Sequence, residues 1–528
     1  MRDRHAIRKG IAGRWLRRLA LAATLFLPVT ALADYSVQVG AFANPDNAAR
    51  VVKRLRSLGY DEVQRFVVQS GRRILHLVLV GRTREAGQAA RLKARLAGQG
   101  WNGFVRRYPE TAVTVAPRPA AEPQSPAVAE PPSPAPAVTL APPPTAEPEP
   151  APRGEWSGSM ALELRAFPQG PAYPRQRGSL NASLAIQPEY YREWNGGSDS
   201  FTFVPFLRLD NRDPERTHAD LRELTWLRAA EDWELRVGVR RVFWGVTESV
   251  HLVDVINQVD LVENTDTEDR LGQPMINLAL IRDWGTVDLF LLTGFRERTF
   301  PGPRGRLRTE PYIDTDQARY ESGAEWRHLD LAARWSRTLG PWDIGLAQFH
   351  GTGREPILQL GLKDGQPVLV PYYPIINQTS LDLQATLGDW LWKLEWLTRD
   401  GQGDRFTAAA GGFEYTFVGI FDTAADLGVI SEYLFDDRGS DATTLFQNDL
   451  MIGLRLTLND AQSSELLFGA STDLDGHEQS FNLEASRRLG DQWKLSIEAR
   501  FARGLNRNGL FGSIRNDDYV QAELAWYF

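Results

Sequence analysis

The chain ends with Tyr519-Val520-Gln521-Ala522-Glu523-Leu524-Ala525-Trp526-Tyr527-Phe528, in which apolar and polar side chains alternate. Successive side chains of a β-strand point to opposite faces, so Val520, Leu524 and Trp526 share one face while Gln521 and Glu523 share the other. About ten residues of this kind suit a wall with lipid on one side and water on the other. The end of the chain therefore predicts a membrane-spanning β-strand.

The same alternation recurs throughout residues 154–528. Fourteen of the 16 tryptophans lie in this region, many near the ends of predicted strands, as in interfacial aromatic girdles. Arginines and glutamates in mid-strand suit a water-filled lumen better than a dry sandwich core. We therefore predict an all-β, antiparallel transmembrane barrel. Its clearest further strands are Trp493–Phe501, Phe481–Ser486, Ile452–Leu458, Trp392–Trp396 and Leu180–Gln187.

Short and long connections alternate between the predicted strands. The short turns lie at 230–232, 282–285, 339–341, 387–389 and 489–491, and the long ones at 245–273, 297–320, 353–373 and 504–516. Transmembrane barrels keep short turns in the periplasm and long loops outside. We predict about 18 strands with both barrel ends in the periplasm. Sixteen strands remain possible, because 300–325 and 353–373 are ambiguous.

The N-terminus reads as a secretory signal over residues 1–33. Seven basic residues precede an apolar core at Leu19–Val29, and Ala31-Leu32-Ala33 supplies a small-x-small cleavage pattern. The chain has no cysteine, which excludes a disulfide framework, a thiolate metal site and a thiol nucleophile.

Residues 34–108 predict a small α+β domain. The strands are expected at 35–42, 62–69, 74–81 and 103–108, with helices at 46–58 and 83–99. This βαββαβ, ferredoxin-like order places both helices on one face of an antiparallel sheet and leaves the other face open. Residues 109–153 hold 15 of the 32 prolines, so we expect a disordered linker. In an extended polyproline conformation it would reach about 140 Å.

The stretch Tyr35-Ser36-Val37-Gln38-Val39-Gly40-Ala41-Phe42, with Asn47-Ala48 and Leu58-Gly59-Tyr60, closely resembles the SPOR domain. The resemblance covers about 75 residues and implies binding to peptidoglycan glycan strands that lack stem peptides. By position, the glycan face of the family maps onto Gln38, Leu75, Leu77 and Val105. The sequence departs from the family here, because an aromatic residue and an arginine are usual where Leu75 and Leu77 stand.

Two further resemblances concern the barrel. The final aromatic residue, Phe528, resembles the signal by which the barrel assembly machinery recognises outer-membrane proteins. The stretch Arg240-Arg241-Val242-Phe243-Trp244-Gly245, with Asp254–Asp260, looks like a segment of certain proteobacterial porin-like proteins. We expect residues 249–260 to form a short helix folded into the lumen, as constriction loops of porins do.

Charged side chains on the polar strand faces and in this loop are expected to line the channel. Opposed arginines and carboxylates at a constriction tune the selectivity of a pore. The residues predicted for the lumen are Arg236, Arg240, Asp254, Asn257, Asp260, Glu414, Arg455, Glu484, Glu498 and Arg500. Residues 154–528 hold 37 Lys/Arg and 56 Asp/Glu, a net charge of about −19. We expect a mild preference for cations, and acidic loops that bind divalent ions beside lipopolysaccharide.

Catalytic, metal and cofactor motifs are not found in the sequence. The seven histidines are scattered, without HExxH or paired spacing, and no glycine-rich phosphate loop precedes a helix. We therefore predict no enzyme activity, no metal site and no cofactor. The basic residues of the first domain are spread over its helices, so nucleic-acid binding is not expected.

Three functions fit these observations. The first is a porin-like channel for small polar solutes in the outer membrane, tethered to peptidoglycan by a periplasmic SPOR domain. The second is an export barrel for a polysaccharide or another polymer. The third is a structural tether between the wall and the outer membrane, or a division-site factor, whose barrel conducts nothing.

Overall fold

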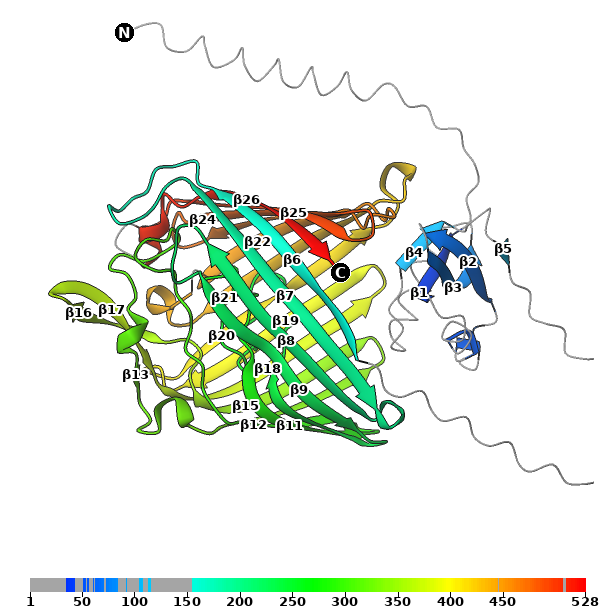
Figure 1. Ribbon diagram of the computed structural model, residues 1–528, viewed down its shortest axis with the longest axis horizontal. Helices are drawn as coiled ribbons and strands as arrows, with labels where there is room; N and C mark the ends of the chain where they lie inside the picture. The colour runs from blue at the N-terminus through cyan, green and yellow to red at the C-terminus, as the bar shows by residue number, and fades with distance from the viewer. Residues whose placement is uncertain are drawn as a thin grey trace, which may run out of the picture. The chain divides into compact units, whose positions relative to one another are not determined.

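The computed structural model shows two separate parts of the chain (Figure 1). It describes residues 35–42, 51–53, 55–56, 60, 62–70, 73–83, 92, 104–107 and 113–114 of the first part, and 154–444, 446–506 and 510–528 of the second. The predicted signal peptide and most of the predicted linker lie outside these residues and stay predictions. Among the described residues, no helix is long and apolar enough to cross a membrane.

The first part contains a five-stranded antiparallel sheet in the order β4-β1-β3-β2-β5. Its strands are β1 (Tyr35–Phe42), β2 (Val63–Ser70), β3 (Arg73–Thr83), β4 (Phe104–Arg107) and β5 (Val113–Thr114). The first four match the predicted strands. The fifth lies in the predicted linker, where it adds to the edge of β2. Residues 51–53, 55–56 and 92 are helical, within the two predicted helices, whose other residues lie outside the described ones.

The second part is a closed barrel of 18 antiparallel strands, which confirms the larger predicted number. The strands are β6 (Glu155–Ala166), β7 (Leu180–Trp194), β8 (Asp199–Asp210), β9 (His218–Ala229), β10 (Trp233–Arg240), β11 (Gln273–Arg282), β12 (Gly285–Leu292), β14 (Asp330–Leu339), β15 (Trp342–Thr352), β18 (Ile375–Leu387), β19 (Trp390–Asp400), β20 (Phe406–Phe417), β21 (Asp426–Asp436), β22 (Asn448–Thr457), β23 (Glu465–Asp473), β24 (Gln479–Leu489), β25 (Trp493–Arg503) and β26 (Tyr519–Tyr527).

The two ambiguous stretches lie outside the barrel wall. There β13 (Arg319–Tyr320), β16 (Ile357–Lys363) and β17 (Gln366–Tyr373) form a separate three-stranded sheet. Its β16–β17 hairpin projects at the left of Figure 1. The predicted number of wall strands was uncertain because the sequence does not show whether these segments belong to the wall.

The barrel closes where its last strand meets its first. Strand β26 pairs antiparallel with β6, with Leu524 opposite Leu162 and Trp526 opposite Met160. The connections at the end that holds both barrel termini have two to eight residues, whereas those at the other end reach 37. All the predicted long connections lie at that second end, so the predicted topology is confirmed. Short 3₁₀ turns occur at Asn195–Gly197, Thr315–Gln317, Glu325–Arg327, Ile420–Asp422, Gly439–Asp441 and Leu510–Ile514.

The outer surface of the barrel is apolar, as a lipid-facing wall must be. Leucine and isoleucine side chains such as Leu331, which is 54% exposed, cover it on many strands. Aromatic pairs gather at the short-turn end: Trp156 and Tyr190 lie 5.1 Å apart between ring centroids, and Trp390 and Tyr415 lie 4.8 Å apart. They form the predicted girdle. Because short turns face the periplasm, we call the opposite end extracellular.

Candidate functional site

Residues 241–272 form one long connection, the lumen loop, between β10 and β11. Its two ends are neighbours, because Arg240 pairs with Gln273 in the ladder. The side chain of Asn257 closes its base: the amide nitrogen donates to the carbonyl oxygens of Arg240 (2.9 Å) and Leu271 (2.8 Å), and the amide oxygen accepts the Val242 N–H (2.8 Å). Asn257, predicted to line the lumen, is therefore fully buried and structural.

The lumen loop crosses the barrel to the opposite wall. The backbone N–H groups of Val246 and Thr247 donate to Oε1 of Glu395 on β19 (2.7 and 3.0 Å), and that of Val253 donates to its Oε2 (3.1 Å). Farther round, Ser249 N–H donates to Glu432 on β21 (2.9 Å). In the closed ring these strands lie far from β10. A segment that reaches them from β10 must run through the interior.

One side of the lumen loop is packed as a small apolar core inside the barrel. Trp244, Val253, Val255 and Ile256 are buried against the inner side of β11, β12, β14, β15 and β18. Val250 and Leu252 pack against a second cluster on β20–β22. Burying side chains of this size stabilises a loop by about 1.5–3 kcal/mol each. The first half of the loop is thus a fixed part of the interior, and no helix forms at 249–260, contrary to our prediction.

The second half of the lumen loop returns to the near wall through ion pairs. Asp260 contacts Arg222 of β9 (2.7 Å), and Glu263 contacts Arg208 of β8 (2.7 Å). His218 lies 3.7 Å from both carboxylates. These three acidic and imidazole groups could hold a metal ion, since their ligand atoms lie within 4.8 Å of one another. A cation would have to displace the arginines, so we assign the cluster to loop attachment.

Beside this cluster, the loop also binds the last strands of the barrel. Asp266 pairs with Arg500 of β25 (3.1 Å), and Asn264 donates to Glu498 (3.1 Å). Arg500 also pairs with Glu484 (2.8 Å) and Glu498 (2.9 Å). The structure therefore brings together these three predicted lumen residues around one loop segment.

The remaining predicted lumen residues form local pairs. Glu414 lies 3.4 Å from Arg455, which also contacts Glu248 of the loop (2.7 Å). Arg240 donates to Asn277 (2.7 Å), Arg236 pairs with Glu234 on its own strand, and Asp254 pairs with Arg270 inside the loop (3.1 Å). Asp254 and Asp260 are buried attachments of the loop.

A polar cavity of about 310 Å³ remains beside the returning half of the loop. Its walls come from β6–β9, β25, β26 and the loop. Three charged groups that line it, Arg241, Asp269 and Glu523, form no ion pair with another described side chain. Burial, reinforced by the negative charges of Asp266 and Glu263, raises the pKa of Asp269 to about 7. The cavity thus offers uncompensated charge to a solute.

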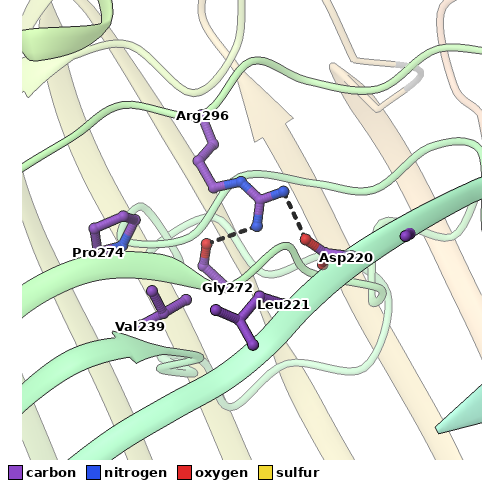
Figure 2. Close-up of a pocket in the computed structure, with 7 residues that line it drawn as sticks. Asp220, Leu221, Val239, Gly272, Pro274 and Arg296 are labelled. Carbon is purple, nitrogen blue, oxygen red and sulfur yellow. Dashed lines mark hydrogen bonds and ion pairs between the residues drawn. The ribbon is translucent and has the colours of Figure 1, made fainter. Parts of the chain in front are cut away.

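A second hollow, of about 380 Å³, lies where the short strand β10 ends. Figure 2 shows its lining, with Leu221, Val239 and Pro274 beneath Arg296. The Arg296 guanidinium pairs with Asp220 (2.6 Å) and donates to the Gly272 carbonyl oxygen (3.0 Å). A Cβ at Gly272 would lie 2.4 Å from the Leu221 carbonyl oxygen. Glycine therefore lets the end of the lumen loop seal the wall beside β9.

Sequence reasoning missed the carboxylates that hold the loop. Glu395 is fully buried in the strand Trp390-Leu391-Trp392-Lys393-Leu394-Glu395-Trp396, and Glu432 occupies a similar place on β21. The buried charges in the middle of both strands were visible in the sequence. Their partners were not, because the loop residues lie 149 positions before Glu395 and 183 before Glu432.

Of the predicted glycan face, the structure describes one side chain. Leu77 is 4% exposed and pairs with Phe66 of β2, so it is buried where an open face was expected. Ser36 is also buried, and its hydroxyl donates to the Val80 carbonyl oxygen (3.3 Å). The side chains of Gln38, Leu75 and Val105 lie outside the described residues.

Comparison with protein families matches residues 31–107 to the SPOR domain. The chain carries a SPOR domain. The match overlaps the predicted segment at residues 34–107. With the closed barrel and its apolar outer wall it places the chain in the bacterial outer membrane, with the SPOR domain in the periplasm. A search of curated proteins found no match.

Solved structures similar to the barrel include two proteins of Pseudomonas. A BenF-like porin from Pseudomonas fluorescens Pf-5 has 11% identity and a TM-score of 0.43, covering 72% of this chain and 98% of that one. OccK11 (OpdR) of Pseudomonas aeruginosa has 10% identity and a TM-score of 0.41, covering 71% and 96%. Wzi of Escherichia coli, a carbohydrate-binding barrel involved in group 1 capsule assembly, has 8% identity and a TM-score of 0.41, covering 70% and 84%.

Proposed function

We propose that the barrel is a narrow diffusion channel for small polar solutes and that the SPOR domain holds it to peptidoglycan. One observation carries the channel: the lumen loop fills one sector of the interior with an apolar core but leaves a polar cavity along β6–β9, β25 and β26. A barrel that served only as an anchor to peptidoglycan would need no such division of its interior. This arrangement supports transport and not catalysis.

The size of the cavity limits the solute. A volume of about 310 Å³ lies at the lower end of cavities that hold small molecules, which begin at about 300 Å³. A sugar or an amino acid fits this space. The cavity therefore supports passage of solutes of that cross-section, and the loop deletion described below separates the channel from a polymer exporter.

The charges in the cavity set the proposed selectivity. Among the charged groups of the cavity that form no ion pair with a described residue, two are acidic, Asp269 and Glu523, and one is basic, Arg241. Fixed carboxylates in a narrow pore raise the local concentration of cations. We therefore expect cations to pass more readily than anions.

Recordings from the full chain in planar bilayers test the channel. We expect a small conductance that rises with salt and favours cations, and a larger conductance when residues 242–271 are replaced by a short turn. Current only after this deletion would identify a plugged exporter. If neither protein conducts, the barrel is a structural tether.

The tether has its own test. Amidase-treated peptidoglycan sacculi should retain the full chain, whereas a chain without residues 34–108 should stay in the supernatant. Equal retention of both would remove peptidoglycan binding from the proposal and leave the channel untouched.

A further inference from the structure

Four extracellular connections gather their arginines into one group, the arginine patch. It consists of Arg175, Arg177, Arg212, Arg304 and Arg515. The connections lie at 167–179, 211–217, 293–329 and 504–518, three of them between strands of one sector of the barrel. In Figure 1 the β6–β7 connection and the last 3₁₀ turn meet at the upper left.

Hydrogen bonds hold the patch together. The backbone N–H of Arg177 donates to the Arg304 carbonyl oxygen (3.0 Å), Arg212 Nε donates to the Leu180 carbonyl oxygen (3.2 Å), and Arg515 donates to the Tyr173 hydroxyl (3.2 Å). Segments from opposite parts of the sequence thus place these arginines on one surface.

The positive charge of the patch is not compensated. Arg175, Arg177, Arg212 and Arg304 are exposed, and none of them pairs with a carboxylate in the described part of the chain. Among the acidic groups of these connections, Asp517 pairs with Arg306 and Asp518 with Arg503. Asp213 is buried and accepts the Gly302 N–H (2.9 Å). Glu215 is exposed and forms no ion pair within the described residues, so it is one carboxylate beside five arginines. The patch is therefore basic on a barrel whose net charge is about −19.

The height of the patch on the barrel identifies its surroundings. Leu180, 53% exposed, and Leu209, 49% exposed, are lipid-facing residues at the extracellular ends of β7 and β8. Arg177 lies three residues before Leu180, and Arg212 lies three residues after Leu209. The patch thus begins where the apolar wall ends, which is the level of lipid headgroups.

We propose that the arginine patch binds the phosphate groups of lipopolysaccharide in the outer leaflet. Guanidinium groups make paired, charge-assisted hydrogen bonds to phosphate oxygens. Our sequence prediction placed divalent ions between acidic loops and lipopolysaccharide, whereas this surface contacts the phosphates directly. The inference is independent of whether the barrel conducts.

Lipid binding to the purified full chain in detergent tests the proposal. The triple variant R177Q/R212Q/R304Q should bind diphosphorylated lipid A at least about tenfold more weakly in native mass spectrometry, since three charged contacts are lost. The control R192Q/R228Q/R282Q removes the same charge from exposed positions at the periplasmic end and should change binding less than about twofold.

Three outcomes overturn the proposal. Equal losses in both triple variants would show general charge attraction. Equal binding of lipid A without its phosphates would show apolar adhesion only. Inorganic pyrophosphate that displaces lipid A completely at equal concentration would show a site for a free anion. Heat-modifiable migration on gels verifies that both variants are folded.

Discussion

Replacing Glu395 by alanine should release the lumen loop from the far wall. The carboxylate accepts hydrogen bonds from the N–H groups of Val246, Thr247 and Val253 and from the Thr247 hydroxyl, at 2.7–3.1 Å. Each bond contributes about 1–1.5 kcal/mol, and more to a charged acceptor. Four bonds give about 4–6 kcal/mol, and water that enters the vacated space offsets part of this. We expect a loss of about 4 kcal/mol in loop attachment.

Hydrogen exchange measured by mass spectrometry reads this loss directly. Amides that open locally exchange in proportion to the opening equilibrium, so about 4 kcal/mol corresponds to roughly a thousandfold faster exchange for residues 246–253. Asp436→Ala is the control, because this buried carboxylate binds Arg438 (2.6 Å) and not the loop. Unchanged protection at 246–253 in a folded Glu395→Ala barrel would refute the reasoning and assign loop attachment to the apolar clusters alone.

Two further predictions concern the loop's second half. The pKa of Asp269 is raised to about 7, so the side chain takes up a proton as the pH falls through neutrality, and cation selectivity should fall between about pH 8 and pH 6. Asp269→Asn should show the low selectivity at both pH values. A wild-type selectivity that does not change with pH would contradict this prediction. Gly272→Ala places a Cβ 2.4 Å from the Leu221 carbonyl oxygen, so it should lower the stability of the barrel by about 1–3 kcal/mol. The temperature at which the barrel loses its folded gel mobility should fall accordingly. An unchanged temperature would mean that the backbone at the end of the strand shifts to make room.

The wall of the barrel was predictable because its signal is local. Alternation along the last strand assigned Val520 to the apolar face, where the structure leaves it 40% exposed, and connection length assigned the two ends of the barrel. The strand number was less certain, since the β16–β17 hairpin alternates as a wall strand does. Only long-range pairing separates the two, and a sequence pattern does not contain it.

The interior was less predictable because its partners are distant in sequence. We expected a helix at 249–260 from the resemblance to porin constriction loops, yet Leu252 and Ile256 pack against different walls of the barrel. Because its apolar side chains are buried against two different parts of the barrel wall, the segment follows an irregular path instead of a helix. Asn257 looked like a pore-lining amide for the same reason: its three backbone partners are brought together only by the closed base of the loop.

That closed base has a consequence for how such a protein diversifies. The loop leaves and re-enters the wall at the last rung of the β10–β11 ladder, where Arg240 pairs with Gln273, and Asn257 ties the two strand ends together. The hydrogen-bonded wall is thus continuous beneath the loop, and one connection carries much of what fills the interior. A change in the sequence of this connection alters the interior while the wall strands stay paired. Glu395 and Glu432 fix the places where any such connection must present N–H groups.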